Sequence, residues 1–520
     1  MDFHSRKNLY DDKALDNTKE YLESKIKAKL TLRKKKLNQE IQVKRKFYLD
    51  QINVGSKTKL NSQFKFKYKK FEQNCNQIID YLNSKDNDFI SYALNELRIY
   101  FTYNFANPNE QKIIMDTKLL SILLNLGKIF IKEKNQENLR QILWILVNIP
   151  ILEEGLAEYL NILYSKEFLE FYNDSLIFIK EFEYYTLIRN ILDNLISSNY
   201  ELNLLLLRSN VFSSILDYFT TQNEREIKDE ILTLKIINYC VDLSYKEPLI
   251  EEKDIPIINR CLDILLSQSN TKNEEILYHV YLGISYISGL ELDYNFNRKI
   301  INEGLTLNIL NKKFYLLKIN RSLLRIVGLS MRIILNNLTS SDEDCQIIYD
   351  NNVIDYYNKI LIKFDDEPKI LKYVLGGLAN ISVGKYRNEL IKSIIWEEEK
   401  IQKYCNLNDP IRVEFIRIVS FLIYNAELDM LKFIYKTKIL QYFIYIFNNM
   451  NISNVIYQKI LKLINNYLNK FDEKDKENEE FKFIYEKFQE MFTYSERINK
   501  LDCMEVIFDI EKNLKNHYKN

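Results

Sequence analysis

The chain has 520 residues, of which 46% are hydrophobic, while 10 are glycine and 6 are proline. So few turn-forming residues argue against a protein of many strands and tight hairpins, and favour an almost entirely helical chain. The six cysteines and three histidines are scattered, without the close spacing of a zinc site. We therefore expect an all-α protein with reduced cysteines, no metal and no cofactor.

The net charge of +1 conceals an uneven distribution along the chain. Residues 1–70 contain 20 Lys and Arg against 8 Asp and Glu, so the remainder is acidic overall. There is no apolar leader and no run of about 18 apolar residues, so neither secretion nor a membrane span is expected. A basic segment attached to an acidic body can dock on that body, on an acidic protein or on a nucleic acid.

Residues 1–50 form a basic arm. Between residues 25 and 46 it has ten basic residues against the single acid Glu40. Apolar residues recur at spacings of four or seven, at Leu22, Ile26, Leu30, Leu37 and Ile41. The pattern predicts an amphipathic helix. On composition alone, a solvated helix or a non-specific nucleic-acid arm explains it as well as a docking peptide does.

Residues 51–71 are interpreted as a linker. The stretch NVGSKTKLNSQ contains Gly55, Ser56 and few apolar residues, which is typical of a flexible connection. The following run FKFKYKK, residues 64–70, alternates aromatic residues with lysines. It indicates either a further electrostatic contact or, more simply, the start of the first helix of the body.

Residues 72–470 repeat a helical unit. Leucine-rich helices recur with a polar residue near their ends, at Asn148, Asn194, Asp242, Tyr286, Asn337, Asn380, Asn425 and Asn466. Their spacing is close to the about 40–47 residues of armadillo or HEAT repeats. Such repeats stack into a solenoid, and we expect the third helix of each unit to line a concave groove.

Residues 471–520 depart from this repeat. The stretch DEKDKENEE, residues 472–480, predicts a solvated charged loop. Residues 481–492 and 503–514 predict a closing pair of helices, as terminal repeats are usually atypical.

The arm resembles the importin-β-binding domain of the importin-α family of nuclear-import adaptors. Its features are the opening pair Arg6 and Lys7, the core Leu32, Arg33, Lys34, Lys35 and Lys36, and the closing triplet Lys44, Arg45 and Lys46. The family's arginine run before the core is replaced by residues 21–24 (YLES). The resemblance implies a right-handed armadillo superhelix, importin-β as a partner and shuttling between cytoplasm and nucleus. The stretch CMEVIFDIEKNL resembles the family's capping tenth repeat, which binds the export receptor.

The resemblance also implies the site residues. In importin-α, a Trp-x-x-x-Asn pair on each groove helix holds the stems of Lys or Arg between indoles and bonds the peptide backbone through amides. Trp144 and Asn148 form the complete pair here. The degraded counterparts are Asn190, Asn194, Asp242, Asn337, Asn380, Phe421 and Asn425. Singly, each amide is equally typical of a helix surface, and Trp144 also suits a core position.

The leading hypothesis is therefore an adaptor that holds basic localisation-signal peptides in its groove and importin-β on its arm. Lys44, Arg45 and Lys46 would fold back on the groove and compete with cargo. The alternative is an armadillo scaffold with a non-import partner, which the missing indoles favour. Nucleic-acid binding by the arm is a third, less expected reading. No phosphate loop or nucleophile elbow is present, so an enzyme is not expected, and Trp396 is interpreted as a packing residue.

Overall fold

The computed structural model describes residues 71–103, 113–114, 117–148, 162–163, 165–178, 182–196, 200–222, 226–242, 250–290, 296–339, 342–384, 386–424, 428–450 and 454–468. Every regular element within these ranges is helical, which confirms the all-α prediction. The basic arm, the linker up to residue 70 and the C-terminal segment lie outside them. The described helices belong to two units, divided between residues 291 and 292.

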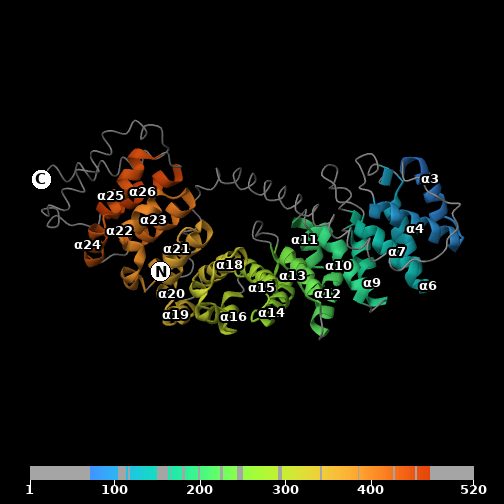
Figure 1. Ribbon diagram of the computed structural model, residues 1–520, viewed down its shortest axis with the longest axis horizontal. Coiled ribbons are helices and arrows are strands. Elements are labelled where there is room, and N and C mark those ends of the chain that lie inside the picture. Colours follow the sequence, from blue (N-terminus) through green and yellow to red (C-terminus); the bar gives the residue numbers. More distant parts are fainter. Residues whose placement is uncertain are drawn as a thin grey trace. The chain divides into compact units, whose positions relative to one another are not determined.

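The N-terminal unit contains two series of helices, labelled in Figure 1. Its helices are α3 (Phe71–Leu82), α4 (Asn87–Tyr103), α6 (Leu119–Glu133), α7 (Gln136–Asn148), α9 (Lys166–Phe178), α10 (Phe182–Ile196), α11 (Tyr200–Leu207), α12 (Asn210–Thr221), α13 (Ile227–Val241), η2 (Glu252–Asp254), α14 (Ile255–Ser267) and α15 (Glu274–Ile287). Helices α4, α7, α10, α13 and α15 each pack against the next, and α6, α9, α12 and α14 form a second, parallel series. We call the first series H3 helices, because each closes one repeat.

The C-terminal unit is built in the same way. Its helices are α16 (Phe296–Asn302), α17 (Leu305–Asn311), η3 (Phe314–Leu316), α18 (Arg321–Asn337), α19 (Asp342–Asp350), α20 (Val353–Phe364), α21 (Pro368–Val383), η4 (Arg387–Lys392), η5 (Ile394–Trp396), α22 (Glu398–Asn406), α23 (Asp409–Tyr424), α24 (Leu428–Lys436), α25 (Ile439–Asn449) and α26 (Asn454–Leu468). The H3 helices here are α18, α21, α23 and α26, which again pack in order.

Short polar turns position the helices. Asn273 accepts hydrogen bonds from the backbone N–H groups of Glu275 and Ile276 at the start of α15, and Asn320 accepts one from Leu323 at the start of α18. Such caps satisfy N–H groups that have no partner inside the helix. Lys118 and Lys438, just before α6 and α25, adopt left-handed φ values of 53° and 56°. Residues other than glycine therefore make tight turns in this glycine-poor chain.

The core is apolar and contains the predicted free thiols. Cys240, Cys261 and Cys405 are buried, and burial raises the pKa of Cys261 and Cys405 to about 12. Trp396 is also buried, and its indole N–H donates to the carbonyl of Leu390 at 2.6 Å, which confirms it as a packing residue. Among the described helices, none has the length and apolar character needed to cross a membrane.

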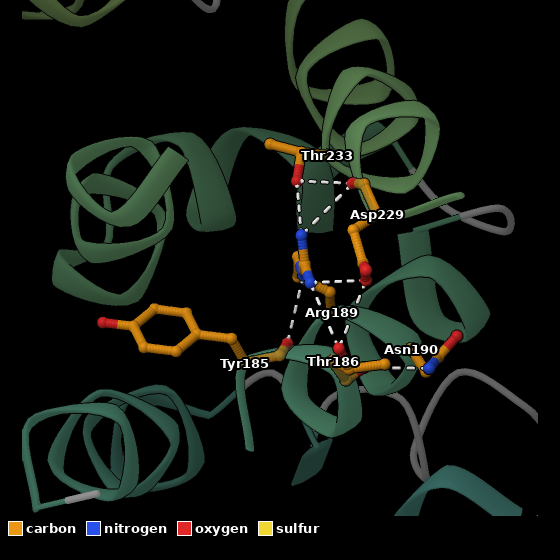
Figure 2. Close-up of polar contacts among 6 residues, drawn as sticks. All are labelled: Tyr185, Thr186, Arg189, Asn190, Asp229 and Thr233. Atoms are coloured by element: carbon orange, nitrogen blue, oxygen red, sulfur yellow. Dashed lines mark hydrogen bonds and ion pairs between the residues drawn. The ribbon is translucent and has the colours of Figure 1, made fainter. Parts of the chain in front are cut away.

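A buried ion pair joins the H3 helices α10 and α13 (Figure 2). Arg189 is 2% exposed and Asp229 is 7% exposed, and Nη2 of Arg189 lies 2.7 Å from Oδ1 of Asp229. The guanidinium also donates to Thr186, to Thr233 and to the carbonyls of Tyr185 and Asp229. These contacts occupy the five N–H donors of the arginine, so a buried cation is fully paired.

Desolvation acts on both members of this pair. Burial lowers the pKa of Arg189, and the carboxylate of Asp229 opposes that change. Burial likewise raises the pKa of Asp229, and the guanidinium of Arg189 opposes the rise. Each charge is therefore maintained by the other, and removing one leaves the second buried without compensation.

We expect Asp229→Ala to destabilise the N-terminal unit by about 3–5 kcal/mol, because Arg189 would remain buried without its carboxylate. Urea denaturation followed by circular dichroism measures the effect. The matched control is Asp355→Ala on α20, which removes an exposed ion pair with Lys359 and should barely move the midpoint. Equal midpoint shifts in the two variants would contradict this assignment.

Candidate functional site

Each H3 helix leaves one stripe of residues that its neighbours do not cover. In the C-terminal unit, the stripe of α21 includes Lys369, Lys372, Tyr373 and Asn380, whereas Gly376, which lies between them in sequence, is buried. A Cβ added there would lie 3.3 Å from Leu335 on α18 and 3.5 Å from a carboxylate oxygen of Glu414 on α23. The side chains of Leu335 and Glu414 thus approach Gly376 from the H3 helices on either side of α21. Leu335 and Glu414 are themselves partly exposed, and they mark the face on which a bound segment would rest.

Trp144 occupies the corresponding stripe of α7 and is partly exposed. Glu137 and Arg140 on the same stripe are exposed, and Gln141 is partly exposed one turn before Trp144. Oε1 of Gln141 is buried and accepts no hydrogen bond within the structure described. Because this atom is buried, the acceptor open to a cationic side chain stacked on Trp144 is the exposed carboxylate of Glu137, about two turns earlier on the same stripe.

The neighbouring helix α4 adds an aromatic and acidic edge. Nδ2 of Asn138 on α7 donates to Oγ of Ser91 on α4 at 3.0 Å, which fixes the two helices in register. Tyr92 and Glu96, four residues apart on α4, are partly exposed. Burial raises the pKa of Glu96, and burial together with Glu96 raises the pKa of Tyr92.

The H3 helices of the N-terminal unit carry an excess of acid. These helices contain nine acidic and five basic residues. The acidic residues are Asp88, Glu96, Glu137, Glu183, Asp193, Asp229, Glu230, Glu274 and Glu275, and the basic residues are Arg98, Arg140, Arg189, Lys228 and Lys235. Such a balance attracts basic segments over distances of about 8 Å at physiological ionic strength.

Several predicted site residues lie in positions whose side chains are not described. Asn148 lies in α7 and Asn194 lies in α10, and for both residues only the backbone is described. Outside the described residues altogether are Asn425 and the arm residues Arg6, Lys7, Arg33, Lys34, Lys35, Lys36, Lys44, Arg45 and Lys46.

Two predicted site residues of the N-terminal unit are buried. Asn190 is 5% exposed, and its Nδ2 donates to the carbonyl of Thr186 on the same helix at 2.9 Å. Asp242 follows α13 and is 2% exposed, with its backbone N–H donating to the carbonyl of Asn238. Both residues contribute polar contacts to the fold and little surface to the stripe.

On α18 the exposed stripe lies one residue away from the predicted position. Asn337 has no exposed surface, and its Nδ2 donates to Oγ1 of Thr306 at 2.6 Å. Ile333, one turn earlier, is also fully buried. The partly exposed pair at this spacing is Arg332 and Asn336. The helical spacing of Arg321, Arg325 and Arg332 is the signal in the sequence that identifies this face.

The remaining predicted residues on α21 and α23 are partly exposed. Nδ2 of Asn380 donates to the carbonyl of Leu335 on α18 at 3.2 Å, so this amide links two H3 helices. Phe421 has the guanidinium of Arg417 5.8 Å from its ring centroid. Arg417 is in turn paired with Glu414 at 2.6 Å. The aromatic platform at Phe421 therefore already holds a cation from its own helix.

No group of three or more His, Cys, Asp or Glu side chains within the described ranges is placed to hold a metal ion. His279 is buried on α15, where its carbonyl accepts a hydrogen bond from Nδ2 of Asn238 at 2.9 Å. This contact joins α13 to α15 and makes His279 part of the packing between H3 helices.

No protein-family model matches the sequence, and no curated protein matches it. Solved structures do match. An engineered protein from the Northeast Structural Genomics Consortium has a TM-score of 0.62 at 14% identity, covering 84% of this chain and 98% of its own. A structure concerning a phosphorylation switch between cadherin and β-catenin has a TM-score of 0.57 at 11% identity, covering 85% of this chain and 83% of its own.

A designed armadillo-repeat protein also matches, with a TM-score of 0.37 at 12% identity, over 47% of this chain and 96% of its own. The first two likenesses, at 14% and 11% identity, concern the fold alone, and the third carries no argument at its TM-score. The H3 helices themselves begin at residues 87, 136, 182, 227, 274, 321, 368, 409 and 454, a spacing of about 45 residues that is typical of armadillo repeats. The fold is therefore that of an all-α armadillo-repeat solenoid.

Proposed function

We propose that this protein is a nuclear-import adaptor whose N-terminal unit binds basic peptide segments on its H3 face. The observation that carries the proposal is the setting of Trp144, a partly exposed indole on an armadillo H3 helix within an acidic layer. An extended peptide suits this face, because successive repeats offer equivalent positions along one direction.

Stacking and hydrogen bonding would act together at Trp144. The indole offers a flat surface for the aliphatic stem of a lysine or arginine, and its π-system attracts the cationic head. The exposed carboxylate of Glu137, about two turns before Trp144 on the same helix, can accept a hydrogen bond from that head. Arg140, which is exposed on this stripe, would favour cargo whose basic residues are not continuous.

The arm supports the same proposal through its sequence. Its basic core at residues 32–36 resembles the importin-β-binding helix, and importin-β is the partner that this resemblance supplies. Lys44, Arg45 and Lys46 would occupy the acidic H3 face when importin-β is absent. Tethering raises the local concentration of this triplet, so even weak contacts would compete with cargo. The protein would then move between cytoplasm and nucleus, with export depending on residues 503–514.

The alternative function is an armadillo scaffold for a partner outside nuclear import. It is favoured because several of the predicted groove amides form hydrogen bonds within the fold. Asn190 and Asn380 donate to carbonyls within the fold, and Asn337 donates to Thr306. Arg417 also covers Phe421. In the C-terminal unit, these contacts leave fewer side-chain amides and aromatic rings that could bind a peptide as an import adaptor does.

For the arm, we expect replacement of Arg33, Lys34, Lys35 and Lys36 by alanine to weaken capture of importin-β by the full chain at least tenfold, because charge-assisted contacts would be lost. A pull-down with purified importin-β at several salt concentrations measures this. The matched control replaces Lys65, Lys67, Lys69 and Lys70 by alanine and should retain capture. If neither variant differs from the wild type, or none is captured, the scaffold function is preferred.

For the face itself, we expect Trp144→Ala to raise the Kd of a fluorescein-labelled peptide with clustered lysines at least several-fold, in a chain lacking residues 1–50. The lost stacking is worth about 0.5–2 kcal/mol for each basic side chain. Fluorescence polarisation gives the Kd. Tyr445→Ala on α25, an exposed aromatic in the other layer, serves as control. An unchanged Kd for Trp144→Ala would remove this residue from the binding site.

A further inference from the structure

The H3 helices of the C-terminal unit carry the opposite charge to those of the N-terminal unit. Helices α18, α21 and α26 contain seven Lys and Arg and no Asp or Glu: Arg321, Arg325, Arg332, Lys369, Lys372, Lys459 and Lys462. Helix α23 is balanced, with Asp409 and Glu414 against Arg412 and Arg417. This excess arises although residues 71–520 as a whole are acidic.

The basic residues of α18 and α21 lie on the exposed stripe. Arg332, Arg325 and Arg321 precede Leu335 by three, ten and fourteen residues, which places them on one face of α18. Lys372 and Lys369 precede Gly376 by four and seven residues, on the matching face of α21. Leu335 and Gly376 are themselves in contact range, so two basic stripes run along adjacent helices.

Both acids of the adjoining helix α23 are already paired. Glu414 contacts Arg417 at 2.6 Å, and Asp409 contacts Arg412 at 3.1 Å. In contrast, Arg321, Lys369, Lys372 and Lys462 are exposed and take part in no ion pair among the described residues. The four acids of α19, Asp342, Glu343, Asp344 and Asp350, belong to a different layer. Glu367, the N-cap residue of α21, is the acid closest in sequence to Lys369.

Apolar and amide groups lie between the basic residues. Leu324, Leu329 and Leu335 on α18 are partly exposed, as are Asn336 on the same helix and Tyr373 on α21. A phosphate backbone needs cations above all, whereas a peptide also needs apolar contacts and partners for its backbone amides. The mixture therefore fits a peptide with alternating acidic and apolar side chains better than it fits a nucleic acid.

We propose that this surface, formed by the exposed stripes of α18 and α21 with the adjoining residues of α23 and α26, binds an extended acidic and apolar segment of a partner protein. We call it the basic face. The proposal concerns a second ligand class and stands independently of nuclear import. One chain would thus hold segments of opposite charge on its two units, and a basic cargo peptide would be repelled from the C-terminal one.

The test is binding of a fluorescein-labelled 15-residue peptide of repeated Glu-Leu-Asp to the full chain, measured by fluorescence polarisation. The variant Lys369→Glu with Lys372→Glu reverses two charges on the basic face. The control variant, Lys359→Glu with Lys363→Glu, makes the same charge change on α20, in the other layer of the same unit. Because both variants retain the basic arm, binding through the arm affects them equally.

We expect the α21 variant to raise the Kd at least fivefold and the α20 variant to raise it less than twofold. Lys369→Arg with Lys372→Arg should keep binding within twofold of the wild type, since the charge remains. Equal weakening by the α20 and α21 variants, or the absence of binding, would overturn the proposal. Tighter binding of a 15-nucleotide single strand, lost in the α21 variant alone, would also overturn it by assigning the basic face to nucleic acid.

Discussion

The structure depends on polar side chains that reach from one H3 helix to the next. Asn138 bonds Ser91, Asn238 bonds the carbonyl of His279, and Asn380 bonds the carbonyl of Leu335. Arg189 and Asp229 do the same with full charges. A polar group buried without a partner costs about 1–3 kcal/mol, so each contact allows one register between neighbouring helices. Apolar burial stabilises the stack, and these contacts fix which stripe of each helix remains exposed.

This arrangement explains why the fold could be predicted from sequence while the site could not be predicted in full. Leucine-rich helices at intervals of about 45 residues, with few glycines, are a pattern of composition and period, and both can be recognised in a single sequence. The side on which an amide lies depends on a single residue of register. Asn336 and Asn337 are adjacent, yet one is partly exposed and the other fully buried. Repeat spacing alone cannot distinguish them.

Other features depend on contacts between repeats. Arg189 and Asp229 are 40 residues apart, and nothing in either local sequence indicates that they meet. Asn190 has the residue type and spacing of a groove amide but bonds to its own helix. The left-handed backbone conformation at Lys438 likewise could not be predicted from the sequence, because the residue is not a glycine. In each case, tertiary contacts decide a conformation that local propensity leaves open.

The two H3 layers also differ in charge, because acidic residues prevail on the H3 helices of the N-terminal unit and basic residues on those of the C-terminal unit. Trp144 lies in the acidic layer and Lys372 in the basic one, so each unit would select its ligand by the sign of its charge before any close contact forms.

Photocrosslinking of a lysine-rich and an acidic peptide, mapped by mass spectrometry, tests this selection by charge most directly. The account predicts crosslinks on α4 and α7 for the first peptide and on α18 and α21 for the second. Crosslinks concentrated on α12, α14, α20 and α25 would contradict it.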